Sequence, residues 1–339
     1  MRGSNFIILC LIVFFTLAIP TEIRCRQVSV ISDVKQSYTQ AMESAVDDAM
    51  DDIVESDSGD VISLNKQFLL DQFYHTLFIN LGCTADTVKQ NAIKAYIPIV
   101  LLVDTDGFYI YYSDTASGVD GETLIAKNWT DKLTFTYVEE NGGRIFNFTL
   151  GNVVNVYDPN TNHVFNMDYQ DLSKLALFNT DDPDNDCYRS SLLCDGDFDT
   201  IRRTTIINAL TDSMTYYINQ HNRVAKQYGF TYHFSLPYIS DDDWARTIDD
   251  ISMVAIFQGY PYVSDAPQLG YFNLYSIGGA RIVKPDYYYI MADLQGTEYY
   301  HKKNCNRLSS ADSSVWNHPY ESPKQCAKKG AYPCPECNP

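Results

Sequence analysis

The chain has 339 residues, a formal net charge of −18 and 45% hydrophobic residues. This hydrophobic content excludes a wholly disordered protein, and the length accommodates one large domain or two ordinary ones. A negative charge of this size repels phosphate groups. We therefore do not expect the main part of the chain to bind nucleic acid or anionic lipid headgroups.

The N-terminal segment is an almost unbroken apolar run, Phe6–Ile19, that follows Arg2 and ends at Pro20. As a helix it would be about 21 Å long, which is shorter than the ~30 Å hydrocarbon core of a bilayer and favours a signal peptide. However, no clean small-x-small cleavage site precedes Arg24 and Arg26. Residues 1–26 are therefore either a signal peptide or a membrane anchor. Both alternatives predict an extracytoplasmic protein, membrane-anchored or secreted.

The chain that follows alternates between helical and strand patterns. Apolar residues three and four positions apart predict five helices. These cover Gln27 to about Ser56, Ser63–Leu81, Ala85–Tyr96, Ile201–Tyr228 and Trp244 to about Asp250.

A period of two predicts about six strands that form an antiparallel meander. They are Ile99–Val103, Phe108–Tyr112, Leu133–Val138, Arg144–Leu150, Val153–Tyr157 and His163–Met167. Further strands are predicted at Phe230–Leu236 and Tyr287–Met291. The expected fold class is α+β, with an N-terminal apolar stem and helices packed on the meander. Residues 27–298 form the helical stem and the α+β body in this interpretation.

An apolar stem that leads into an alanine-bearing helix and then a β-rich head is similar to TadE/TadG-type minor pilins of tight-adherence secretion systems. The resemblance covers roughly residues 1–115 and rests on organisation. The glycine and position-five glutamate of ordinary type IV prepilins are not matched, because Gly3 is followed by Ser4, Asn5 and Phe6. The resemblance implies a component of a surface appendage or secretion apparatus, with protein partners and a membrane contact through the N-terminal segment.

The last part of the chain, residues 299–339, carries the most specific chemical pattern. His301-x3-Cys305 and Cys334-x2-Cys337 supply one imidazole and three thiols, enough for a closed tetrahedral zinc site. The spacing of the first pair indicates ligands about one helical turn apart. Cys326 is an additional thiol in a helix-like run, and His318 is a substitute ligand. The alternative to zinc is two disulfides, or one disulfide with two free thiols.

The same tail, from Tyr299 to Pro339, resembles a small Cys/His metal-binding module that ends many bacterial secreted or membrane-attached proteins, including some nucleases. In outline it is similar to the metal-binding domain of the Ada repair protein, which uses a cysteine where His301 stands. The resemblance implies ligands at His301, Cys305, Cys334 and Cys337 in a zinc-ribbon-like module, and we do not carry over methyl transfer.

An acidic segment near the middle of the chain allows a calcium hypothesis. Two ladders of alternating carboxylates could converge on a hard cation, but both lack the glycine and glutamate of an EF-hand loop. They are Asp182-x-Asp184-x-Asp186 and Asp195-x-Asp197-x-Asp199. A solvated acidic loop is the preferred interpretation. In this segment Cys187 and Cys194 form either a disulfide or two separate thiols.

Catalytic motifs are not recognisable in the sequence. Gly-x-Ser-x-Gly, His-Glu-x-x-His and P-loop patterns do not occur, and we predict no catalytic or cofactor-binding residues apart from the zinc ligands. The expected function is that of an extracytoplasmic, membrane-tethered structural or binding protein. The alternatives are a secreted hydrolase, such as a nuclease, or a ligand-binding sensor, each with the tail as a targeting module. Six Lys or Arg against three acidic residues between His301 and Pro339 allow an anionic surface as a partner of the tail, but a solvated lysine-rich surface is the preferred interpretation.

Overall fold

The chain divides into two units in the computed structural model, Met1–Arg281 and Ile282–Pro339. The second unit takes in the strand at 288–292, which the sequence analysis assigned to the body. The structure describes residues 2–55, 64–117, 123–140, 143–175, 178, 190–194, 198–227, 229–262, 270–279, 288–293, 296–302, 305–310, 315, 320 and 323–337.

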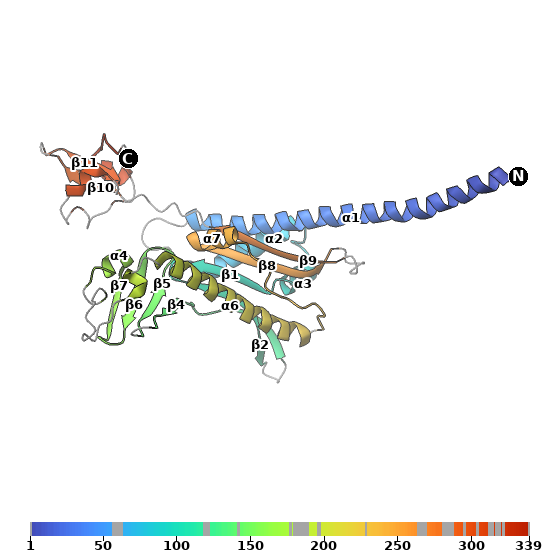
Figure 1. Cartoon of the computed structure of the whole chain (residues 1–339), viewed down its shortest axis with the longest axis horizontal. Helices are drawn as coiled ribbons and strands as arrows, with labels where there is room; N and C mark the ends of the chain where they lie inside the picture. The colour runs from blue at the N-terminus through green and yellow to red at the C-terminus, as the bar shows by residue number, and fades with distance from the viewer. Residues whose placement is uncertain are drawn as a thin grey trace. The chain divides into compact units, whose positions relative to one another are not determined.

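A single long helix, α1 (Arg2–Glu55), replaces the separate apolar segment and stem helix of the sequence analysis. Its C-terminal half packs on α2 (Lys66–Asn80) and on strands β8 (Ser252–Pro261) and β9 (Tyr271–Gly279) through a seam of small and flexible apolar side chains (Figure 1). This buried seam consists of Ala41, Met42, Ala45, Val46, Ala49 and Met50.

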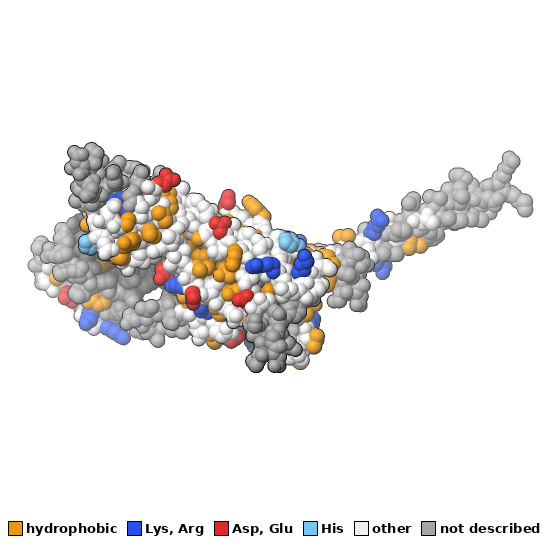
Figure 2. All heavy atoms as spheres, turned by 90° about the horizontal axis from the view of Figure 1, so that it is seen from below, with side chains coloured by type: hydrophobic (Ala, Val, Ile, Leu, Met, Phe, Trp, Pro, Cys, Tyr) orange, Lys and Arg blue, Asp and Glu red, His pale blue; other side chains and the backbone are white. Residues whose placement is uncertain are grey.

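The N-terminal half of α1 lies apart from the rest of this unit in Figure 1. None of its described side chains before Ala41 is buried, and Phe14 and Val28 are 63% and 65% exposed. Figure 2 shows basic and hydrophobic side chains along this projecting part. Most side chains of the apolar run Phe6–Ile19 lie outside the described residues. Within the described part of the chain, no helix combines the length and apolarity needed to cross a membrane.

The first sheet has five antiparallel strands in the order β3-β2-β1-β8-β9. They are β1 (Ile99–Asp104), β2 (Gly107–Ser117), β3 (Thr123–Trp129), β8 (Ser252–Pro261) and β9 (Tyr271–Gly279). Every residue of β1 is buried, because helices cover both faces of the sheet. Helices α1 and α2 lie on one face and α6 (Phe198–Gln227) on the other (Figure 1).

The second sheet has four antiparallel strands in sequence order. They are β4 (Phe135–Val138), β5 (Ile145–Phe148), β6 (Val153–Asp158) and β7 (His163–Asp168). The prediction of one six-stranded meander is therefore wrong, since the first two of those strands belong to the other sheet. Helix α6 joins the two sheets in one hydrophobic core through a stripe at helical spacing, which includes Ile206, Leu210, Met214 and Ile218.

Short helices complete this unit. They are α3 (Thr87–Ala95), α4 (Tyr169–Leu172), α5 (Ser191–Cys194) and α7 (Asp241–Asp249). Each of α3 and α7 begins where a side chain accepts a hydrogen bond from a backbone N–H of the first turn, as helix N-termini require. For α7 the acceptor is Ser240, and three aspartates follow it in the first turn, where the helix dipole favours negative charge.

The strand predicted at Phe230–Leu236 is not formed. This segment is instead held by side chains. The amide of Asn222 on α6 donates to the carbonyl of Phe234 at 2.7 Å and accepts from its N–H at 2.8 Å. Gln258 on β8 accepts from the N–H of Ser235 at 3.0 Å and donates to its carbonyl at 2.7 Å. These contacts satisfy the backbone groups that a neighbouring strand would otherwise pair.

The C-terminal unit contains a small sheet of the order β10-β11-β12. Strands β10 (Tyr288–Ala292) and β11 (Glu298–Lys302) are antiparallel, and the two-residue β12 (Tyr332–Pro333) runs parallel to β11. A 3-10 helix, η2 (Asn306–Ser310), and α9 (Pro323–Lys328) connect them.

Some sequence expectations fall outside the described residues. These are the first acidic ladder, Asp195 and Asp197 of the second, Cys187 of the Cys187/Cys194 pair, and His318. The remaining ladder residue, Asp199, accepts hydrogen bonds from Arg202 at 2.6 Å and 3.2 Å. Its carboxylate is thus engaged in an ion pair on α6.

Candidate metal centre

The small sheet of the C-terminal unit places His301 on a buried face. His301 lies on β11 opposite Tyr289 of β10 and is 1% exposed. Because successive side chains of a strand point to opposite faces, Tyr300 lies on the other side of the sheet. The sheet therefore separates two small buried groups of side chains, one on each face.

The three cysteines reach the face of His301 from turns. Cys305 follows the end of β11, and its N–H donates to the carbonyl of Lys302 at 3.0 Å. His301 therefore lies in a strand and not in the first turn of a helix, as its spacing from Cys305 had suggested. Cys334 directly follows β12 and donates its N–H to the carbonyl of Tyr300 at 3.1 Å. Cys337 lies in the turn after it.

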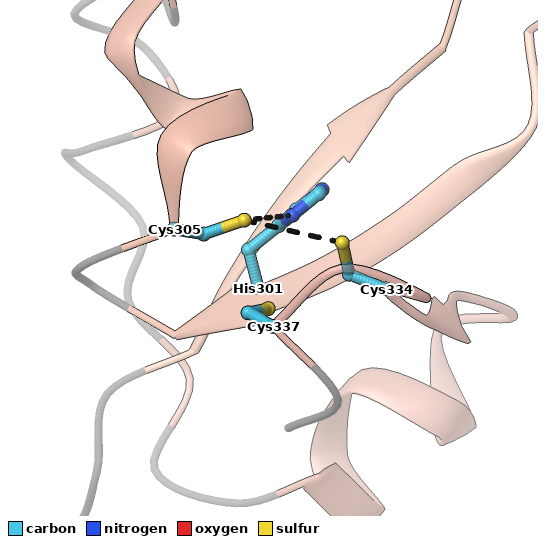
Figure 3. Close-up of side chains that lie close together, drawn as sticks. All are labelled: His301, Cys305, Cys334 and Cys337. Carbon is cyan, nitrogen blue, oxygen red and sulfur yellow. Dashed lines mark hydrogen bonds between the residues drawn. The ribbon is translucent and has the colours of Figure 1, made fainter.

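The four predicted ligands converge on one point (Figure 3). Their donor atoms all lie within 4.8 Å of one another. Nδ1 of His301 is 3.3 Å from Sγ of Cys305, which is 3.9 Å from Sγ of Cys334. In a tetrahedral site with Zn–S bonds of ~2.3 Å, two sulfur atoms are ~3.8 Å apart. The geometry therefore fits one metal ion held by four protein ligands.

The distance between the cysteine sulfur atoms does not fit a disulfide bond. A disulfide needs two sulfur atoms at ~2.05 Å, whereas Cys305 and Cys334 are 3.9 Å apart. Cys305, Cys326, Cys334 and Cys337 are all free thiols. Three thiols and an imidazole that meet in a buried place, with no covalent bond between them, have the composition of a metal site.

Backbone amides favour the thiolate form of Cys334 but do not overcome burial at Cys337. Burial alone raises the pKa of Cys334, but the backbone amides of Cys337 and Glu336 outweigh this effect and lower it. For Cys337 burial dominates and raises the pKa to about 11, although the amide of Lys302 acts in the opposite direction. Burial also lowers the pKa of His301, with a smaller contribution from Arg307. A neutral imidazole and a stabilised thiolate are the protonation states that bind a metal.

Arg307 and Glu336 form an ion pair beside the cluster. Nε of Arg307 donates to Oε1 of Glu336 at 2.7 Å, which links η2 to the Cys334–Cys337 turn. The contact joins the two ligand-bearing turns across the site. The sequence analysis did not single out this pair, because its members are distant in sequence and neither belongs to a ligand motif.

Cys326 is not a member of the cluster. It is fully buried on α9, where it packs with Tyr288, Tyr300 and Ala331 on the other side of the sheet. Burial raises the pKa of its thiol, which keeps it protonated. The structure thus separates Cys326 from the four candidate ligands.

Comparisons with known protein families, characterised proteins and solved structures find no match for this chain. The two family resemblances of the sequence analysis receive no support from them. What the structure does contain is the buried group His301, Cys305, Cys334 and Cys337. A proposal for the bound metal and for the function of the chain must therefore be argued from the geometry and chemistry of its own residues.

Proposed function

We propose that this chain is an extracytoplasmic, membrane-tethered protein with a structural or binding role in a bacterial surface appendage or secretion apparatus. The observation that carries the proposal is the difference in packing between the two halves of α1. Its C-terminal half is built into the core, while its N-terminal half projects and exposes large apolar side chains such as Phe14 and Val28. Exposed apolar surface of this kind is stabilised by lipid or by a protein partner.

In this proposal the tail holds a structural zinc ion. Thiolate and imidazole ligands suit zinc, and the four protein donors would fill a tetrahedral coordination sphere. A filled sphere leaves no position for a water molecule, so the ion would stabilise the unit and would not activate a nucleophile. The small buried groups on either side of the β10-β11-β12 sheet explain why the unit needs such an ion.

The metal is tested by elemental analysis of the full chain, purified in neutral detergent without chelator. We expect about one zinc per chain in the wild type and in Cys326→Ala, and its loss in Cys334→Ser, since one ligand of four is removed. Cys326→Ala is the matched control because it removes an equally buried thiol outside the cluster. Absence of metal in the wild type, with the tail cysteines oxidised in pairs, would refute the zinc assignment.

The location is tested by expression in a bacterial host. The wild type should be recovered with the membrane fraction, and protease added outside spheroplasts should digest it. Deletion of residues 6–19 should leave the protein soluble and protected inside the cell, because the apolar segment supplies both export and attachment. A wild-type protein found soluble in the cytoplasm contradicts the proposal.

A further inference from the structure

The β4–β7 sheet has one face in the core and one face open to solvent. Its inward residues form two rows across the four strands and pack in the core around α6. One ring contact joins Phe148 to Phe198 on α6 at a centroid distance of 5.5 Å. The inward rows are Tyr137, Phe146, Val156 and Phe165, and Phe135, Phe148, Val154 and Met167.

Two adjacent rows of outward residues have a chemistry that is unusual for a solvated surface. The first, which we call the amide row, consists of Thr136, Asn147, Asn155 and Asn166, each paired in register with the next. The second, the apolar row, consists of Val138, Ile145, Tyr157 and Val164. Val138 and Val164, at the two edges, are 56% and 71% exposed.

Hydrogen bonds order one end of the amide row. Oγ1 of Thr136 donates to Oδ1 of Asn147 at 2.7 Å, and the hydroxyls of Thr134 and Thr136 are 2.9 Å apart. Because Thr136 uses its proton on Asn147, Thr134 is the donor to Thr136. The carbonyl end of the Asn147 amide is thus fixed, and its NH₂ group is left to bind another acceptor.

These two rows contain no charged residue, although the chain as a whole carries a net charge of −18, and the charge in the next outward row is Asp168, which pairs with Val153. A sheet face that only needs to be soluble usually carries lysine or glutamate, which also prevent unwanted association. Carboxamides both donate and accept hydrogen bonds, and an aromatic ring with aliphatic neighbours offers an apolar strip. Such a face matches a ligand that is uncharged, rich in hydroxyls and partly apolar.

We propose that this face binds a neutral polysaccharide. Neighbouring strands are ~4.8 Å apart, so the amide row repeats its hydrogen-bonding groups at that interval. This interval is close to the length of one sugar unit in an extended glycan, whose hydroxyls can pair with successive amides. The sugar C–H faces lie against Tyr157 and the aliphatic side chains of the apolar row. The inference goes beyond the proposed function, since it gives the body a ligand and does not depend on the metal.

The test is affinity electrophoresis of the full chain in neutral detergent. The acidic protein migrates towards the anode, and binding to an immobile polysaccharide retards it. The probes are dextran, laminarin, mannan and hydroxyethyl cellulose, with polygalacturonate as an anionic comparison. We expect retardation by at least one neutral polymer and none by polygalacturonate. Asn155→Asp or Asn166→Asp should raise the dissociation constant about tenfold, because each replaces a donor with a desolvated charge.

Asn219→Asp is the matched control, because it adds the same charge at an exposed position of α6. It should leave retardation unchanged. No retardation by any neutral polymer, or equal retardation of Asn155→Asp, Asn166→Asp and the wild type, would overturn the proposal. So would a dimeric wild type that becomes monomeric in Asn155→Asp and Asn166→Asp, since the face would then be an interface between two copies.

Discussion

At the scale of single residues, Gly278 on β9 determines how closely α1 approaches the first sheet. A Cβ at this position would lie 2.7 Å from Cγ1 of Val46 and 3.1 Å from its carbonyl carbon. We expect Gly278→Ala to lower the free energy of unfolding by about 1–3 kcal/mol, since the helix must move away from the strand. Urea denaturation measures this loss.

The neighbouring glycine supplies the control. A Cβ at Gly279 would meet only the carbonyl oxygen of Ile251, at 3.9 Å, which is an ordinary contact. Gly279→Ala should therefore leave stability unchanged or raise it slightly, because alanine restricts the unfolded chain. Equal effects of the two substitutions would show that α1 does not depend on this close approach.

The buried side chain of His221 makes the stability of the fold depend on pH. Its ring is 4% exposed, Nδ1 is 3.1 Å from Oγ of Ser113, and the ring packs edge-on against Phe234. Burial, with a smaller effect of Lys127, lowers its pKa to about 3. The unfolded chain then binds more protons than the folded one between pH 6.5 and 3, so stability falls as the pH drops through this range.

We expect the wild type to lose about 2 kcal/mol more than His221→Gln between pH 7 and pH 5, because glutamine does not titrate. Urea denaturation of both proteins at the two pH values gives the difference, and the effects of all other titrating groups cancel in it. If the two proteins lose stability in parallel, His221 is not held neutral by the fold.

At the scale of elements, one asparagine replaces a strand partner. Asn222 is the residue that holds the Phe234 backbone, with one hydrogen bond given and one accepted. Asn222→Ala leaves both backbone groups without these partners, and we expect it to lower the free energy of unfolding by about 2–4 kcal/mol. Asn219→Ala, at an exposed position of α6, should cost less than about 0.5 kcal/mol. Denaturation of both variants measures the contrast, and similar losses would contradict this role.

The secondary structure could be predicted from the sequence only where local interactions determine it. The predicted strands Ile99–Val103 and Phe108–Tyr112 do pair, as the β1–β2 hairpin, because the turn chemistry of Asp104-Thr105-Asp106-Gly107 acts locally. The apolar alternation in Phe230–Leu236 predicted a strand wrongly, since partners distant in the chain supply its hydrogen bonds. Strand β9 was missed, and its pairing with β8 depends on packing against α1. Which strands share a sheet is likewise decided by α6 and the common core.

The residues of the metal centre could be predicted from the sequence more completely than the pairing of the strands. Ligand type and short spacing are local properties of a sequence, and they identified His301, Cys305, Cys334 and Cys337, which the fold brings together. The spacing could not predict that His301 lies on a strand, nor that a sheet separates Cys326 from the cluster. The Arg307–Glu336 pair was equally hidden, because its contact exists only after the two turns meet.

At the scale of the whole molecule, the two units should differ in their dependence on metal. The first unit has a core of its own that joins two sheets and α6. The second has two small buried groups, one of which is centred on Cys305 and Cys334. Because a unit this small gains much of its stability from a bound ion, removal of the metal should unfold Ile282–Pro339 and leave Met1–Arg281 folded.

Limited proteolysis of the full chain with and without a chelator tests this division. With chelator, cleavage should remove the C-terminal unit and leave a protected fragment that ends near Arg281, and added zinc should restore protection. Cys334→Ser should give the same fragment without chelator, whereas Cys326→Ala should not. Identical digestion with and without chelator would mean that the C-terminal unit folds without metal. Digestion of both units would mean that the ion stabilises the body as well, and the two units would then fold as one.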